Sequence, residues 1–216
     1  MAGKTVQKLV LEKGETMVLL HLFSAEEWAA YAIVQNLGSL VVRIFFLPVE
    51  ELSQLAFSKL LSGGEAREAG TVLQMVLKLV VLVGGLSASF GPGYAYAVVR
   101  VLYGSKWSGT SLPNVLSSYS VYLIFVALNG VTEAFTHASA SPAQMARRGA
   151  ALFPCTIIYL ALAWACAPAL GLHALILGNA VNMALRTALS LAHARAYYAE
   201  NSPPSDGDDK LAAAAA

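Results

Sequence analysis

The sequence predicts an all-α fold, a polytopic bundle of membrane-spanning helices, on the basis of its composition and its apolar runs. Of the 216 residues, 57% are hydrophobic and only 12% are charged, whereas a soluble domain usually carries about 25% charge. Apolar runs long enough to cross about 30 Å of hydrocarbon recur along the chain. The formal net charge of +1 gives no sign of a nucleic-acid partner. We therefore expect the lipid bilayer to surround most of the chain.

The first residues leave two alternatives open. Residues 5–23 mix leucine and valine with charged side chains and offer only a short apolar run at their end. They form either an interfacial amphipathic helix or the end of a span whose beginning is missing. Ser24, with Glu27 three residues later, is the capping-box pattern that starts a helix. The first complete span is expected to follow.

The first span, residues 31–51, carries an arginine near its middle. An arginine near the bilayer centre costs at least about 2.5 kcal/mol, so it normally faces a water-filled cavity or a partner inside the bundle. Pro48 lacks the N–H group that the preceding turn would bond, which predicts a kink. At 100° per residue the polar side chains fall on one side of this helix, and they are Asn36, Ser39, Arg43 and Glu50.

A loop and a second span follow. Residues 53–71 contain SGGEAREAG, a predicted loop with turn glycines and mixed charge. Residues 72–90 form the second span. Residues 91–113 contain GPG, three tyrosines and Trp107, and look too broken to cross. They predict an interfacial loop with an aromatic anchor.

The third span, residues 115–136, is polar on one face and aliphatic on the other. Glu133 is the sole acid inside the body of a predicted span. It is either an interior site or close enough to the end of the helix to reach the headgroups. The polar face consists of Ser118, Tyr122, Asn129, Thr132, Glu133 and Thr136.

Two further spans complete the membrane part. Residues 139–149 predict a short basic loop, and residues 150–170 form a fourth span with few polar groups. Gly171 then turns the chain into a fifth span, residues 172–192, so that the two helices form an antiparallel hairpin. One face of the fifth helix is polar and carries Asn179, Asn182, Arg186, Ser190, His193 and Tyr197.

The chain therefore divides into a membrane-embedded helical domain, residues 1–200, and a tail, residues 201–216. The tail is polar and low in complexity, and we expect it to be disordered. Lysine and arginine are in small excess on the side that holds the loop after the first span. The positive-inside rule then places that loop and the C-terminus in the cytoplasm.

The polar stripes admit two interpretations. An arginine that pairs with Glu50 or Glu133 would fasten helices together. One or two polar groups suffice for that, whereas each stripe has four to six, so we favour a hydrophilic cavity. A guanidinium fork fits phosphate oxygens, which suits an anionic, phosphorylated or carboxylated solute. The predicted substrate-binding residues are Arg43, Arg186, Asn36, Glu50, Asn129, Glu133, Asn179 and Asn182.

Catalysis has little support in the sequence. No aspartate occurs before Asp206, and the four histidines are scattered singly, so neither a metal site nor a general base is indicated. There is no Walker-type glycine loop to hold a nucleotide. We expect a protein that is not an enzyme, with no metal and no cofactor.

Four stretches of the sequence carry a resemblance to a known family. They are KLVLEKGE, NLGSLVVRIFFLPVEE, LNGVTEAFTHA and GNAVNMALRTALSLAHARAYY. Over roughly residues 7–199 the chain resembles the Rft family of endoplasmic-reticulum membrane proteins. The resemblance implies a multi-pass protein of that membrane, in the multidrug/oligosaccharidyl-lipid/polysaccharide exporter superfamily. Members of this superfamily have two six-helix lobes around a central cavity.

The resemblance also implies a substrate. The family is associated with translocation of a dolichol-diphosphate-linked, mannose-rich oligosaccharide during protein N-glycosylation. The diphosphate would then lie near Arg43 and Arg186, the sugar hydroxyls near the asparagines, and the polyprenyl tail in lipid. The chain looks like the first part of the second lobe, so its partner would be the remaining half of a longer protein. The alternatives are a non-transporting scaffold for N-glycan precursor assembly and a secondary transporter of small anions.

Overall fold

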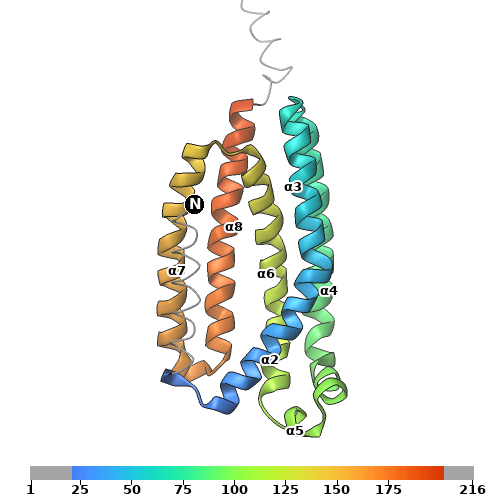
Figure 1. Ribbon diagram of the computed structural model, residues 1–216, viewed down its shortest axis with the longest axis vertical. Helices are drawn as coiled ribbons and strands as arrows, with labels where there is room; N and C mark the ends of the chain where they lie inside the picture. The colour runs from blue at the N-terminus through green and yellow to red at the C-terminus, as the bar shows by residue number, and fades with distance from the viewer. Residues whose placement is uncertain (1–20, 202–216) are drawn as a thin grey trace, which may run out of the picture.

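The computed structural model describes residues 21–201, which form an elongated bundle of helices (Figure 1). Five helical segments are long and apolar enough to cross a membrane, as the sequence predicts, and the described residues contain no strand. The first segment is α2 (Ala25–Val41), a π-helical turn η1 (Val42–Phe46) and α3 (Leu47–Ser62); the others are α4 (Ala66–Tyr103), α6 (Leu112–Ser139), α7 (Pro142–Leu170) and α8 (His173–Asn201), with a short α5 (Ser105–Ser108).

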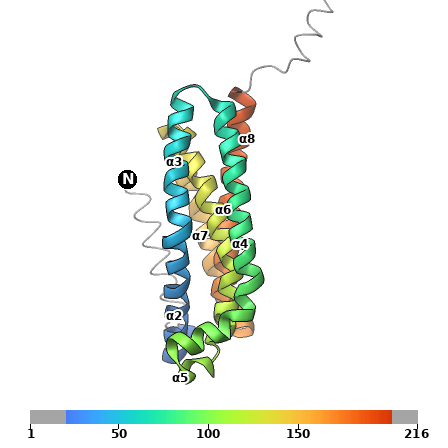
Figure 2. The same ribbon diagram turned by 90° about the vertical axis from the view of Figure 1, so that its right-hand side faces the viewer.

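Helix α6 lies at the centre of the bundle. It packs against α3 and α4 on one side and against α8 on the other, and α7 packs against α8 (Figures 1 and 2). Its apolar side chains reach into both hydrophobic clusters of the protein. Helix α6, which carries the polar stripe of the predicted third span, therefore contacts both the α2–α3 segment and α8, on which the stripes of the first and fifth spans lie.

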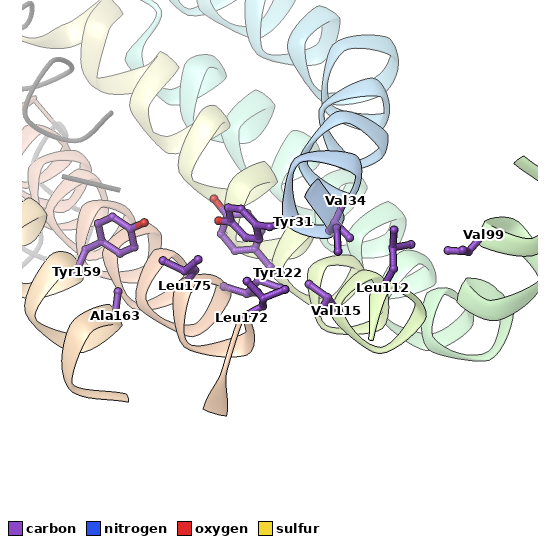
Figure 3. Packing of buried hydrophobic residues seen from close by; sticks show 12 residues of the cluster. Tyr31, Val34, Val99, Leu112, Val115, Tyr122, Tyr159, Ala163, Leu172 and Leu175 are labelled. Atoms are coloured by element: carbon purple, nitrogen blue, oxygen red, sulfur yellow. The ribbon is translucent and has the colours of Figure 1, made fainter. Parts of the chain in front are cut away.

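Two clusters of buried hydrophobic side chains hold the helices of the bundle together. Figure 3 shows one of them, in which Tyr31, Val99, Val115 and Tyr159 come from different helices. In the other cluster, the rings of Phe57 and Phe135 meet edge to face with their centroids 5.4 Å apart. Burial of these side chains supplies the packing on which the positions of the polar groups depend.

The capping signals and the predicted hairpin are confirmed. The Ser24 hydroxyl accepts the N–H of Glu27, whose carboxylate accepts the N–H of Ser24. Gly171 has φ of +57°, in the left-handed region that glycine adopts without strain, and it joins α7 to α8.

The predicted loop at residues 91–113 is wrong in its first half, because α4 continues to Tyr103 through Pro92. The glycine before the proline makes a helix contact here, not a turn. A side chain at Gly91 would collide with Ser120 of α6. Ala95 and Val99, one turn apart, are 2% and 0% exposed. Burial of this stripe outweighs the hydrogen bond that the proline cannot make.

The predicted basic loop at residues 139–149 is also wrong, since α7 begins at Pro142. Ser141 and Gln144 form a second capping box, in which the Ser141 N–H donates to Gln144 Oε1 at 2.8 Å. Proline at the first helical position supports the same start. The structure does not describe residues 1–20 and 202–216, so the alternatives for the N-terminal segment and the predicted tail lie outside it.

Candidate functional site

The centre of the candidate site is an ion pair between α6 and α8. Arg186 Nη2 lies 2.7 Å from Glu133 Oε2, and the Asn129 amide donates to the same oxygen at 3.2 Å. His137 Nε2 lies 3.6 Å from the other carboxylate oxygen. The side chains of Arg186 and Glu133 keep 21% and 16% of their surface exposed, so the pair is neither dry nor freely solvated.

Two asparagines beside this pair keep unused hydrogen-bonding capacity. Asn129 is 7% exposed and Asn182, about one turn before Arg186 on α8, is 1% exposed. The Oδ1 atom of each is buried and has no hydrogen-bond partner within residues 21–201. A buried acceptor without a partner is costly, and such atoms are available to a ligand or to water.

Arg148 of α7 extends the polar groups toward one end of the bundle. Its Nη2 donates to Ser190 Oγ at 2.6 Å, and its Nη1 donates to Thr136 Oγ1 at 3.4 Å. The Ser190 hydroxyl donates in turn to the carbonyl of Arg186. We call Asn129, Glu133, Arg186, Ser190 and Arg148 the polar seam.

Glu50 reaches the same region from α3. Its carboxylate packs against Gly130 of α6, where an added Cβ would lie 2.5 Å from Glu50 Oε2. The glycine thus leaves room for a second carboxylate close to Glu133. Glu50 and Glu133 are within electrostatic range of one another and of Arg186.

Arg43 does not join this group. Its guanidinium is exposed and bonds its own helix, donating to Ser39 Oγ at 2.7 Å and to the Ser39 carbonyl at 3.2 Å. A shallow hollow of about 460 Å³ beside it is lined by Asn36, Ser39 and Tyr119, among others. The π-helical turn, in which Leu47 N–H bonds the Val42 carbonyl, changes the period of the stripe. It therefore separates Arg43 from Glu50.

The α6 stripe is largely satisfied by its own helix. The Thr132 and Thr136 hydroxyls donate to backbone carbonyls one turn earlier, at 2.9 Å and 3.0 Å. Ser118 instead bonds His173 Nδ1 at 2.8 Å, tying α6 to α8 at the opposite end from Arg148. Because Ser118, Thr132 and Thr136 have hydrogen-bond partners within the protein, they do not need to face water.

The structure thus brings together four of the eight predicted residues, Glu50, Asn129, Glu133 and Arg186. Asn182 is buried on the same helix as Arg186, Asn179 is half-buried, and Asn36 is exposed with Arg43. Arg148 is absent from the predicted set because the sequence pattern predicts a loop for its segment. The SPAQ capping box in the sequence is the signal that could have placed it on a helix.

Comparison with known proteins gives the chain its family. Residues 1–209 match the family described as Rft protein. The Man(5)GlcNAc(2)-PP-dolichol translocation protein RFT1 of Xenopus tropicalis is 37% identical over 202 residues, which cover 88% of this chain and 38% of the relative. The proteins of the same name from Mus musculus and Saccharomyces cerevisiae are each 31% identical, over 90% and 83% of this chain and 38% and 32% of their own lengths.

The chain spans little more than a third of the length of these curated relatives. No solved structure matches it. Because the family match covers nearly the whole chain, the chain belongs to the Rft protein family.

Proposed function

We propose that this chain, as part of a longer protein, contributes to translocation of a dolichol-diphosphate-linked oligosaccharide across the endoplasmic reticulum membrane for protein N-glycosylation. The observation that carries the proposal is the family membership, with relatives named as Man(5)GlcNAc(2)-PP-dolichol translocation proteins. Translocation proteins of this kind bind and move a substrate without chemical change, so we propose that the chain has no catalytic role.

The polar seam supports a binding role within this function. It places a guanidinium, a carboxylate and buried amides between membrane helices. Such groups are costly inside a bilayer and commonly mark a substrate pathway. We propose that Arg186 meets the diphosphate when Glu133 releases it, and that Asn129, Asn182 and Asn179 meet sugar hydroxyls. Glu50 would contribute from α3 beside Glu133, whereas Arg43 and Asn36 would contribute from the separate hollow next to Ser39 and Tyr119.

A chimera tests this proposal. The matching segment of the Saccharomyces cerevisiae relative would be replaced by this chain, and the purified chimera reconstituted in vesicles with labelled dolichol-linked oligosaccharide. We expect transfer of the lipid to the opposite leaflet, and at least a tenfold loss of the rate for Arg186→Gln. Arg195→Gln, an exposed arginine on the same helix, is the matched control and should keep the rate.

The same assay separates translocation from the scaffold alternative. A chimera that restores N-glycosylation in cells but moves no lipid in vesicles would favour a non-transporting scaffold. Equal rates for Arg186→Gln and the control would remove Arg186 from the binding site.

A further inference from the structure

A pocket of about 310 Å³ opens where α7 begins and α6 and α8 end. None of its lining side chains is acidic, and five of them are polar or basic: Thr136, Gln144, Arg147, Arg148 and His193. Two guanidinium groups therefore share one hollow without a carboxylate in its wall. This pocket lies beyond the predicted substrate-binding residues, none of which lines it.

Arg148 is held in place but its charge is not paired. Its two bonds to the Ser190 and Thr136 hydroxyls fix the guanidinium between three helices, and its Nε is buried without a partner in the described part of the chain. The neighbouring carboxylate, Glu133, lies 2.7 Å from Arg186. Among residues 21–201 no carboxylate is within ion-pair distance of Arg148.

The pocket lies at the depth of lipid headgroups. Helix α7 has 29 residues, a length of about 43 Å at 1.5 Å per residue, whereas the hydrocarbon layer is about 30 Å thick. The first turns of α7 therefore extend past the hydrocarbon layer, which agrees with their polar sequence, PAQMARR. Both arginines line the pocket; Arg147 is exposed and Arg148 is half-buried.

A purely structural role explains only part of this arrangement. The two bonds of Arg148 would fasten α7 to its neighbours, and Gln144 caps the start of α7, but neither role explains a second guanidinium, Arg147, in the wall of the same hollow. The volume is at the low end of the range for ligand pockets, about 300 to 1,000 Å³. It suits a headgroup phosphate and is small for an oligosaccharide.

We propose that this pocket binds a phosphate-class anion at the membrane surface, either the phosphate of a lipid headgroup or a soluble diphosphate. Guanidinium groups bind phosphate oxygens through paired N–H donors. Basic pockets between membrane helices are known to hold anionic headgroups. The proposal stands on the pocket alone and does not depend on the proposed translocation.

The test uses the purified chain in phosphatidylcholine nanodiscs. One arm adds a phosphatidylinositol phosphate to the discs, the other adds soluble pyrophosphate, and native mass spectrometry measures saturable binding to the chain. We expect binding in at least one arm, and the arm identifies the source of the phosphate. Arg147→Glu, an exposed position that leaves the fold unaffected, should weaken binding at least tenfold, and Arg148→Gln should weaken it similarly.

Arg195→Glu is the matched control, since Arg195 is exposed on α8 at the same end of the bundle and does not line the pocket. It should change the affinity less than threefold. An equal loss of affinity for Arg195→Glu and Arg147→Glu would mean that binding depends only on the total charge of this end of the protein. That result, or an absence of saturable binding in both arms, would overturn the proposal.

Discussion

Arg186 shows why a charged residue between membrane helices can serve both stability and binding. Its contact with Glu133 offsets the cost of desolvating both groups, and each side chain keeps part of its surface exposed. The fastening interpretation and the binding interpretation of this residue therefore predict the same structure. They differ in what happens when both charges are removed together.

We expect Arg186→Met to destabilise the chain by about 2 kcal/mol, because it leaves the Glu133 carboxylate without its guanidinium partner; a fully buried pair would lose about 3 to 5 kcal/mol. The double variant Glu133→Gln with Arg186→Met should recover about 1 kcal/mol of this loss, since contacting residues are not additive. Unfolding of the chain in mixed detergent micelles measures both values. Arg195→Met, at an exposed position, is the control and should stay within about 0.5 kcal/mol.

The double variant also separates the two roles. If the pair only fastens α6 to α8, a chimera that carries the double variant should still move dolichol-linked lipid. If Arg186 binds the diphosphate, the double variant should be folded but inactive. If the loss of stability in the double variant equals the sum of the losses in Glu133→Gln and Arg186→Met, the two side chains are not energetically coupled.

The sequence predicts only part of the candidate site, and individual residues show why. Helical period placed Asn129 and Glu133 on the same stripe, and the structure joins them by a hydrogen bond at 3.2 Å. Period alone could not tell that Thr132 would bond its own backbone. It also could not tell that a π-helical turn would separate Arg43 from Glu50, because a fixed step of 100° per residue assumes an unbroken α-helix.

Helices α4 and α6 pack closely because glycines of α4 face α6. A Cβ at Gly84 would lie 2.9 Å from the Ile124 side chain and 3.0 Å from its Cα. Seven residues later, Gly91 meets Ser120 in the same way. Small residues at such spacing let membrane helices approach closely, which strengthens their van der Waals contact.

We expect Gly84→Ala to destabilise the chain by about 1 to 3 kcal/mol, because the added methyl group must push α4 away from the α6 backbone. Gly85 offers a neighbouring control, since a Cβ added there would meet nothing within 4 Å. Gly85→Ala should stabilise the helix by about 0.5 to 1 kcal/mol. Thermal unfolding in detergent measures both. Equal effects of the two substitutions would contradict the close approach of α4 and α6.

The packing of α4 against α6 explains which elements could be predicted from the sequence and which could not. Apolar runs and capping boxes depend on neighbouring residues, so the spans and the helix start at Ser24 followed from local pattern. The course of residues 91–103 depends on α6, which is distant along the chain before folding. Gly91 and Pro92 would favour a turn in an isolated peptide. They are helical here because α4 buries Ala95 and Val99.

At the scale of the whole molecule, the basic residues divide unevenly between the two ends of the bundle. One end holds the α3–α4 and α6–α7 connections and the end of α8, and the other holds α5 and the α7–α8 turn (Figure 1). Among residues 21–201, Arg100 and Lys106 lie near the α5 end. The opposite end carries Lys59, Arg67, Arg147, Arg148 and Arg195.

The positive-inside rule then predicts that the α5 end faces the lumen. The sequence has no Asn-x-Ser/Thr triplet, the acceptor for N-glycosylation. Glycosylation of an introduced triplet therefore reports on which side of the membrane that position lies. Gly109→Asn places an asparagine two residues before Ser111, and α4, at 38 residues and about 57 Å, carries this connection well clear of the hydrocarbon. We expect it to be glycosylated in microsomes, whereas Gly64→Asn with Ala66→Ser at the opposite end should not be. The reverse pattern would invert the bundle and place the Arg147–Arg148 pocket in the lumen.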